Sequence, residues 1–275
     1  MSLSSAGVLL GSLALFGESG LGYDAGASFG FDSNVNAATE ASLAQDALRL
    51  DLWAGLGPWF ELSEDWEVDL FGDVGRSQLF DDADLSSTDL GAQAGLSWWA
   101  GDRTVLRLVP RGGFRFFGDS TRNGPSASVS MSLRQGLYGP LWGEVSGRAS
   151  LRRAQDELFD EEGAAAGARL RMHLLDARLI FWGGYAFDFG TYALVTPEAA
   201  PASGSGRGRA SRAIASGTVL VSESVQSHSV SVEAEARFFD PIVIGAGWVL
   251  SIADAGSADP YLSQSLFLAV SVRGG

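Results

Sequence analysis

The clearest candidates for functional chemistry in the sequence are three arginines in the stretch Thr104 to Phe117, TVLRLVPRGGFRFF. Arg107, Arg111 and Arg115 recur every four residues, a spacing that would suit one face of a helix. Pro110 and a glycine pair interrupt such a helix, however, and the leucines alternate with the charges at a period of two. Alternation is strand geometry, because successive side chains of a strand point to opposite faces. The pattern therefore predicts a sheet with a row of guanidiniums on one face and apolar side chains on the other.

The composition argues against several kinds of catalytic and metal site. The 275 residues include no cysteine, which removes disulfides and thiol chemistry. Two histidines, His173 and His228, are too few for a histidine-rich metal centre. All 19 basic residues are arginine and the formal net charge is −14, so nucleic acid is not expected as a partner. The sequence has no run of about 18 apolar residues, so we expect no transmembrane helix. We expect neither a metal nor another cofactor.

The alternation recurs almost to the end of the chain and predicts about 12 strands. Each is close to the roughly ten residues that a tilted strand needs to cross a bilayer. The segment 211–225 could hold a further hairpin, but the alternation changes phase between Val225 and Val230, so we assign the segment to a long loop over 193–224. The predicted strands lie near 23–35, 48–61, 66 onward, 87–99, 104–117, 126–138, 141–153, 163–175, 177–191, 226–239, 242–253 and 261–273.

The predicted connections alternate between short and long. Short ones lie at 63–65, 100–102, 139–140, 176 and 240–241, and long polar ones at 36–45, 81–87, 118–125, 154–163, 193–224 and 254–260. Short turns at one end and long loops at the other are typical of up-and-down outer-membrane barrels. The acidic runs in 81–84 and 156–162 are either solvated loop residues or groups that gather divalent cations near an anionic lipid surface.

A soluble β-sandwich also has alternating strands and is the structural alternative. Two features favour the barrel: the apolar faces are nearly unbroken, and aromatic residues gather where strands end, as in the two girdles of membrane barrels. Those aromatics are Tyr23, Phe60, Trp66, Trp98 and Phe238 by the short turns, and Phe31, Phe116 and Phe189 by the long loops. We therefore predict an all-β fold, a transmembrane up-and-down antiparallel β-barrel over residues 21–275. Residues 1–20 have an apolar run but no positive n-region, and we expect a plug or a periplasmic extension there.

Two short motifs resemble Gram-negative outer-membrane β-barrel proteins. The stretch GFDSNV at 30–35 is similar to the F/Y-D-S-N-V opening strand of barrel domains in envelope export and assembly proteins. The stretch FDPIV at 239–243 resembles a periplasmic D-P turn of small channel-type barrels. The resemblance implies the outer membrane of a Gram-negative bacterium, with lipid and lipopolysaccharide as partners. The final VSVRGG departs from the pattern, since such barrels usually finish with an aromatic residue.

If the apolar residues face lipid, the charged residues of the alternating strands line the lumen. The predicted pore-lining residues are Arg107, Arg111, Arg115, Arg134, Arg148, Arg152, Arg169, Arg171, Arg178, Asp51, Glu67, Asp69, Asp73, Asp89, Glu233 and Glu235. The early strands are thus acidic and the middle strands basic. Such walls either set a transverse field across a water-filled pore or form paired networks that plug and brace the barrel. The sequence leaves both readings open.

Enzyme activity is not expected, because neither histidine has a lipid-facing serine partner at a readable spacing. The first functional hypothesis is a narrow channel for small polar or charged solutes, with selectivity set by the segregated luminal walls. The alternative is a structural barrel subunit that anchors a multi-protein envelope complex for secretion, export or motility, with proteins of that complex as partners.

Overall fold

Nearly all of the chain that can be placed is β-strand. The computed structural model describes residues 19–33, 46–80, 83–176, 178–197, 211–215, 218–239, 241–255 and 260–274. The strands are β1 (Ser19–Asp32), β2 (Ala47–Ser63), β3 (Trp66–Leu79), β4 (Ser87–Trp99), β5 (Thr104–Phe117), β6 (Gly124–Tyr138), β7 (Leu141–Arg152), β8 (Glu161–Leu174), β9 (Leu179–Pro197), β10 (Ser211–Ala215), β11 (Thr218–Phe239), β12 (Ile242–Asp254) and β13 (Tyr261–Gly274). Three 3-10 turns, η1 (Ala83–Leu85), η2 (Ser120–Arg122) and η3 (Glu157–Phe159), lie between strands. Among the described residues, no helix is long and apolar enough to cross a membrane.

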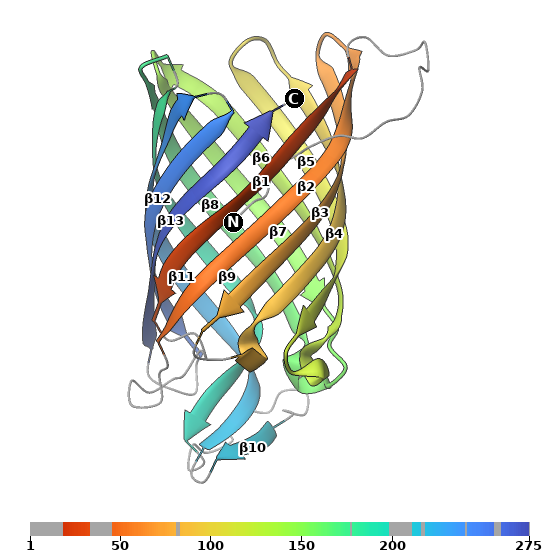
Figure 1. Ribbon diagram of the computed structural model, residues 1–275, viewed down its shortest axis with the longest axis vertical. Coiled ribbons are helices and arrows are strands. Elements are labelled where there is room, and N and C mark those ends of the chain that lie inside the picture. Colours follow the sequence, from red (N-terminus) through yellow and green to blue (C-terminus); the bar gives the residue numbers. More distant parts are fainter. Residues whose placement is uncertain are drawn as a thin grey trace.

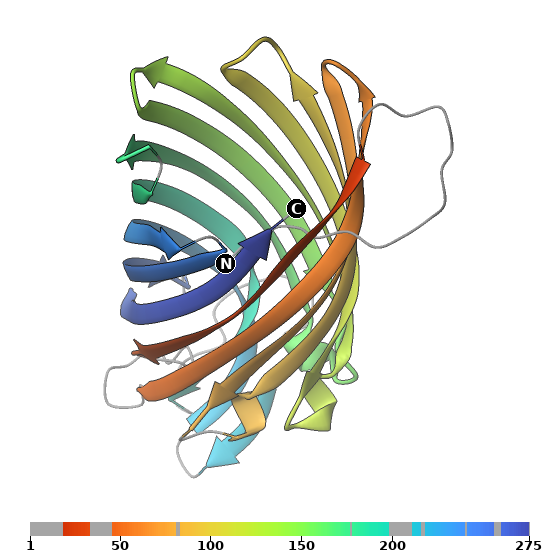
Figure 2. The same ribbon diagram turned by 45° about the horizontal axis from the view of Figure 1, so that its top comes forward.

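The strands close into one ring. From β1 to β9 and from β11 to β13 each strand pairs antiparallel with the next along the chain, β9 pairs with β11, and β13 returns to pair with β1. The short β10 pairs with β11 alone and stands outside the ring, at the lower end of the barrel in Figure 1. Figure 2 shows the remaining strands tilted around a common axis, as closure of a sheet requires. The prediction of a twelve-stranded up-and-down barrel is confirmed.

The two ends of the barrel differ in their connections. Short turns lie at the end drawn uppermost in Figure 1, and longer loops lie at the end that carries β10. Positive φ angles shape several short turns, at Gly101 (72°), Gly139 (50°), Leu175 (51°) and Asp176 (54°). Outer-membrane barrels have short periplasmic turns and longer extracellular loops. We therefore assign the short-turn end to the periplasm and the long-loop end to the cell exterior.

The distribution of side chains is inverted relative to that of a soluble protein. Leu48, Leu52 and Leu56 on β2 are 44%, 46% and 47% exposed, although a soluble fold would bury a row of leucines. Asp24 and Asp69 lie on the inner face and, as whole residues, are 3% and 4% exposed. Because strands alternate faces, the apolar residues cover the outside of the ring and the charged residues are enclosed. This exterior fits the hydrocarbon of a bilayer and not water.

Aromatic residues mark both ends of the outer surface. Near the short turns, Trp66 and Trp98 stack with their ring centroids 6.2 Å apart and remain 41% and 39% exposed. Near the long loops, Phe116 and Phe189 are 41% and 48% exposed. Aromatic rings at these two levels are typical of the girdles that membrane barrels place at the lipid–water interfaces. The side chain of Phe238 lies outside the described residues.

Three parts of the prediction need correction or fall outside the structure. The region 193–224 is not all loop: β9 continues to Pro197 and β11 already begins at Thr218, so the hairpin extends beyond the rest of the barrel. The change of phase seen in the sequence falls within the long strand β11. Ser19 and Gly20, assigned to the N-terminal segment, pair with β2 as the start of β1. Residues 1–18 and 34–45 lie outside the described residues.

Candidate functional site: the barrel interior

The wall formed by β3, β4 and β5 is held together by ion pairs. Arg107 contacts Asp69 at 2.6 Å and Arg111 contacts Asp73 at 2.5 Å, each reaching across β4 to a carboxylate on β3. The side chains of Asp69 and Asp73 are 6% and 3% exposed, and the arginines retain 28% and 27%. Arg115 pairs with Asp89 on β4 at 2.9 Å. All three arginines of β5 therefore have carboxylate partners.

Glycines on β4 make these pairs geometrically feasible. Gly91 lies opposite Asp73 and Gly95 lies opposite Asp69 in the register of β3 and β4. A Cβ at Gly91 would collide with the guanidinium of Arg111, and a Cβ at Gly95 would collide with the ends of both Asp69 and Arg107. Because Gly91 and Gly95 have no side chains, they leave a shallow gap on β4, here called the saddle, over which Arg111 and Arg107 reach β3.

Other inner-face arginines also have carboxylate partners. Arg49 on β2 contacts Asp32 and, at 2.8 Å, Asp51. Arg273 on β13 contacts Glu235 at 3.1 Å and lies 3.7 Å from Asp24. Arg134 on β6 contacts Glu144 on β7 at 3.1 Å. Much of the interior thus follows the paired-network reading.

The wall formed by β7 and β8 differs. Within the described residues, Arg148, Arg169 and Arg171 have no carboxylate within ion-pair distance. Arg148 and Arg169 are exposed although they stand on the inner face. Because that face points towards the barrel axis, their exposure is to the interior, so the side chains of the described residues do not fill the space beside this wall. Asp188 on β9 and Glu233 on β11, on the neighbouring wall, likewise have no arginine partner among the described residues.

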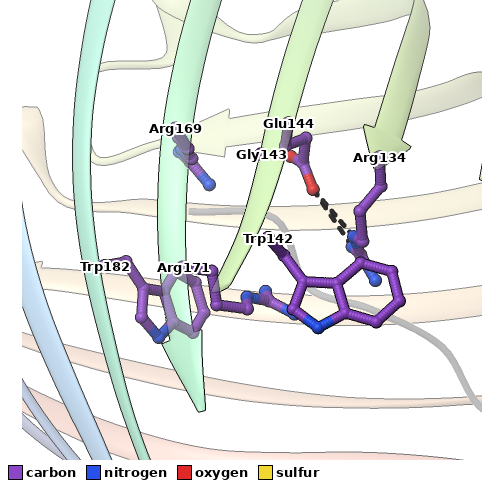
Figure 3. A pocket seen from close by; sticks show the side chains of 7 residues that line it. All are labelled: Arg134, Trp142, Gly143, Glu144, Arg169, Arg171 and Trp182. Atoms are coloured by element: carbon purple, nitrogen blue, oxygen red, sulfur yellow. Dashed lines mark hydrogen bonds and ion pairs between the residues drawn. The ribbon is translucent and has the colours of Figure 1, made fainter. Parts of the chain in front are cut away.

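A recess opens on this wall towards its periplasmic end. It is lined by Arg134, Trp142, Gly143, Glu144, Arg169, Arg171 and Trp182. Figure 3 shows the side chain of Arg171 extended between the rings of Trp142 and Trp182, with Arg169 nearby and Arg134 joined to Glu144. The guanidinium carbon of Arg171 lies 4.5 Å from the ring centroid of Trp182, a cation–π contact. Trp142, Arg171 and Trp182 are register partners on three adjacent strands.

Two long loops form an ordered rim at the extracellular end. Arg152 donates from Nη1 to the carbonyl of Arg122 at 2.6 Å and from Nη2 to the carbonyl of Phe159 at 2.9 Å. Phe159 is 3% exposed, and the guanidinium of Arg122 lies 4.3 Å from its ring centroid. Backbone bonds from Gln155 to Asn123 tie loop 153–160 to loop 118–123. These contacts fold the rim into a packed structure.

The acidic residues of this rim are structural. Asp156 caps η3 by accepting a hydrogen bond from the backbone N–H of Leu158. Arg153 pairs with Asp160 at 3.0 Å and Glu162 at 2.6 Å, and these hydrogen bonds, first that to Glu162, raise the pKa of Arg153. No group of three or more His, Cys, Asp or Glu with metal-binding proximity occurs among the described residues. Asp156, Asp160 and Glu161 thus support the loop, whereas Glu157 and Glu162 stay exposed to solvent.

An apolar patch lies at the same extracellular end of the barrel, between β9, β11, β12 and β13. Leu194, Val225 and Ala253 are at most 5% exposed and pack with Tyr192 and Tyr261. The sequence argument missed this patch because it assigned 193–224 to a loop. The inward phase of β9 and β11, continued past Gly190 and Ser227, would have identified it.

Fourteen of the sixteen predicted pore-lining residues stand on inner strand faces as described. They are Arg107, Arg111, Arg115, Arg134, Arg148, Arg169, Arg171, Asp51, Glu67, Asp69, Asp73, Asp89, Glu233 and Glu235. The other two do not stand open to the lumen, although Arg152 also takes the inward phase of β7. Arg152 is covered by loop 153–160, which leaves its side chain 6% exposed. Arg178 lies in the short turn before β9, because Leu175 and Asp176 reverse the chain there.

The prediction also missed partners and neighbours of these residues. Glu144 pairs with Arg134, and Arg49 and Arg273 complete two further pairs. Trp142 and Trp182 flank Arg171, and both stand on the inward phase of their strands, which is the signal that could have found them. Whether these residues line a conducting pore stays a prediction.

The histidines lie on opposite faces. His173 stands on the inner face beside Trp142, with ring centroids 6.3 Å apart. His228 stands on the outer face, where its Nδ1 is 2.6 Å from the hydroxyl of Tyr185. Among the described residues, neither histidine has a serine partner of the kind that nucleophilic catalysis needs.

Comparisons with known proteins bear on the fold. No protein-family model and no curated protein sequence matches the chain. Among solved structures, an outer-membrane channel from Pseudomonas putida F1 is similar with a TM-score of 0.59 and 11% identity, over 97% of this chain and 100% of that one. The NanC porin is similar with a TM-score of 0.52 and 11% identity, over 91% of this chain and 98% of that one. At such identities the likeness shows a shared fold. It does not test the F-D-S-N-V motif, whose last two residues lie outside the described residues.

The fold and its sidedness together define the class of protein. The chain is a closed antiparallel barrel with the architecture of Gram-negative outer-membrane barrels, an apolar exterior and an ionic interior. The chain is an outer-membrane β-barrel.

Proposed function

We propose that the protein is a narrow channel for small polar or charged solutes. The observation that carries the proposal is the incomplete pairing of the interior: Arg148 and Arg169 face the lumen, are exposed there and have no carboxylate partner among the described residues. A barrel that served only as a rigid plug would be expected to neutralise such charges, because an unpaired charge enclosed in protein is costly. Exposure to an aqueous lumen removes that cost.

The charge of the interior is segregated, but along a different line from the one the sequence suggested. The basic excess lies on β7 and β8, whereas the arginines of β5 are paired with carboxylates. Asp188 and Glu233 provide free carboxylates on the adjoining strands β9 and β11. We infer that solutes pass along these two adjoining walls of opposite charge, which set a field across this side of the lumen. The architecture shared with an outer-membrane channel and a porin supports this proposal.

Ion selectivity in planar bilayers tests the proposal. We expect Arg169→Glu to shift the reversal potential in a salt gradient towards cation selectivity, because it replaces an exposed luminal cation by an anion. Arg76→Glu is the matched control: Arg76 carries the same charge on the outer face of β3, where it bonds Thr88 and Gln78. A reversal potential that does not change in Arg169→Glu, or that changes equally in both variants, would contradict the channel.

A structural barrel subunit is the second candidate. It is favoured by the ion pairs that join β3 to β5 and β13 to β11, and by the rim in which Arg152 ties two loops together. Such bracing suits an anchor for an envelope complex, with envelope proteins as partners. Bilayers that stay silent after insertion of folded barrel, together with proteins that co-purify reproducibly, would support the anchor over the channel.

A further inference from the structure

We propose that the recess around Arg171 is a binding station for the carboxylate group of a small organic monoanion. The proposal rests on the channel function and names the class of solute that this wall selects. The residues that make the station are Arg171, Arg169, Trp142 and Trp182, on β7, β8 and β9.

The charge of the recess requires an anion. Charged side chains near Arg171 include Arg134, Glu144, Glu235 and Arg169. Glu144 is engaged by Arg134 at 3.1 Å, and Glu235 by Arg273 at 3.1 Å. Arg171 and Arg169 therefore hold charges that no described carboxylate neutralises by contact. Two cations are therefore uncompensated, but the enclosed space is small enough to admit only one carboxylate group, so a monocarboxylate fits the recess best.

The donors of the recess are suited to a carboxylate. A guanidinium presents parallel N–H groups that match the two oxygens of a carboxylate. The ring of Trp182, 4.5 Å from the guanidinium carbon of Arg171, holds this cation at the recess, and no described carboxylate occupies its N–H groups. The Nε1–H of Trp182 is buried and has no hydrogen-bond partner among the described residues, which is rare for a buried donor. A ligand oxygen would satisfy it.

The shape of the recess indicates an organic anion whose head alone enters. The enclosed part has room for about one water molecule, which is the size of one carboxylate oxygen, and its remaining side opens into the barrel. The rings of Trp142 and Trp182 border that opening (Figure 3) and offer apolar contact to a carbon skeleton. An inorganic anion could not use this contact.

Binding of benzoate to the detergent-folded full-length barrel tests the station, with tryptophan fluorescence and calorimetry as readouts. We expect Arg171→Gln to weaken benzoate binding about tenfold or more, because it removes a paired charge-assisted contact. Arg171→Lys keeps the charge but loses the two parallel N–H groups of the guanidinium, so its benzoate affinity should lie between that of the unchanged barrel and that of Arg171→Gln. Trp182→Phe keeps a ring and removes the unpaired donor, and we expect a loss of about two- to tenfold.

Two controls separate a built site from general electrostatics. Arg148→Gln removes the same charge from the same wall away from the recess and sets the size of the purely electrostatic effect. Arg171→Gln must exceed it about fivefold for the station to stand. Equal losses in the two variants, or acetate and inorganic phosphate binding as tightly as benzoate at constant ionic strength, would overturn the proposal. Retention of the heat-modifiable band on a gel reports that each variant is folded.

The binding assay does not require conduction, so the two proposals fail separately. Benzoate binding in a barrel that stays silent in bilayers would refute the channel and retain the station. A charge-selective current without a loss of benzoate affinity in Arg171→Gln would refute the station and retain the channel.

Discussion

The wall of β3–β5 and the wall of β7–β8 use the same residue for different purposes. On the first wall, Arg107 and Arg111 lie flat over glycines and end on carboxylates that are almost fully buried. On the second, Arg148 and Arg169 stand exposed in the lumen. Both rows follow from the same alternation of apolar and charged residues. The difference comes from the neighbouring strands, which offer Asp69 and Asp73 to one row and serine, alanine and glycine to most of the other.

This comparison shows what pairing does to a luminal charge. A paired arginine joins neighbouring strands and has little charge left for a solute, whereas an arginine without a carboxylate partner adds no ion pair to the wall and keeps its charge for a solute. The two walls can therefore be distinguished by experiment: changes in the first should be seen in stability, and changes in the second in selectivity.

The largest difference is expected from truncation of one arginine on each wall. Arg111→Ala leaves the carboxylate of Asp73, 3% exposed, without its partner. We expect the free energy of unfolding to fall by about 2–3 kcal/mol, less than for a fully buried pair because Arg111 itself reaches luminal water. Arg148→Ala should change it by less than about 0.5 kcal/mol. Urea unfolding of the barrel in lipid vesicles measures both values.

A double-mutant cycle sharpens this test. Asp73→Ala together with Arg111→Ala removes both charges. The double variant should therefore lose less unfolding free energy than the sum of the losses in the two single variants. Additive losses would mean that the contact between Arg111 and Asp73 does not stabilise the wall. A loss in Arg148→Ala as large as that in Arg111→Ala would remove the distinction between the walls.

A smaller effect is expected from filling the saddle on β4. Gly95→Ala places a Cβ against the ends of Asp69 and Arg107. Because both are ends of side chains, they move aside, and we expect the weakened pair to cost about 1 kcal/mol. Gly112→Ala is the matched control, since a Cβ there meets nothing within 4 Å. It should leave stability unchanged or raise it slightly. The same unfolding assay compares them, and equal values would mean that the saddle is unimportant.

The contrast between the walls also marks where sequence reasoning ends. Alternation at a period of two determines which face each residue takes, so the barrel, most strand ranges and the inward position of fourteen charged residues could be predicted. Pairing depends on the register between strands. Nothing local in the sequence shows that Arg107 reaches over Gly95 to Asp69, two strands away. The segment at 211–225 failed for a related reason, because its pairing with β9 outweighs its irregular alternation.

The register also explains why the recess escaped notice. Trp142, Arg171 and Trp182 are far apart in the chain and become neighbours only because β7, β8 and β9 align them at one level. Two tryptophans on inward positions are a weak signal alone, since inner-face aromatics elsewhere, such as Phe71 against Gly55, simply fill the wall.

The smallest expected effect is on ion selectivity. It comes from comparing a double variant of the first wall that keeps the luminal net charge with a double variant of the second wall that lowers it by two. Arg107→Gln with Asp69→Asn removes a pair without changing the luminal charge, so we expect the anion-to-cation permeability ratio to stay within about 1.3-fold. Arg148→Gln with Arg169→Gln removes two unpaired cations and should lower that ratio about two- to threefold at about 0.1 M salt. Because the Debye length shrinks from about 10 Å to about 3 Å at 1 M salt, this difference should nearly vanish there. A shift that persists at high salt would mean that the two arginines bind ions by direct contact instead of through their field, and a shift in the neutral double variant would show that paired charges also select.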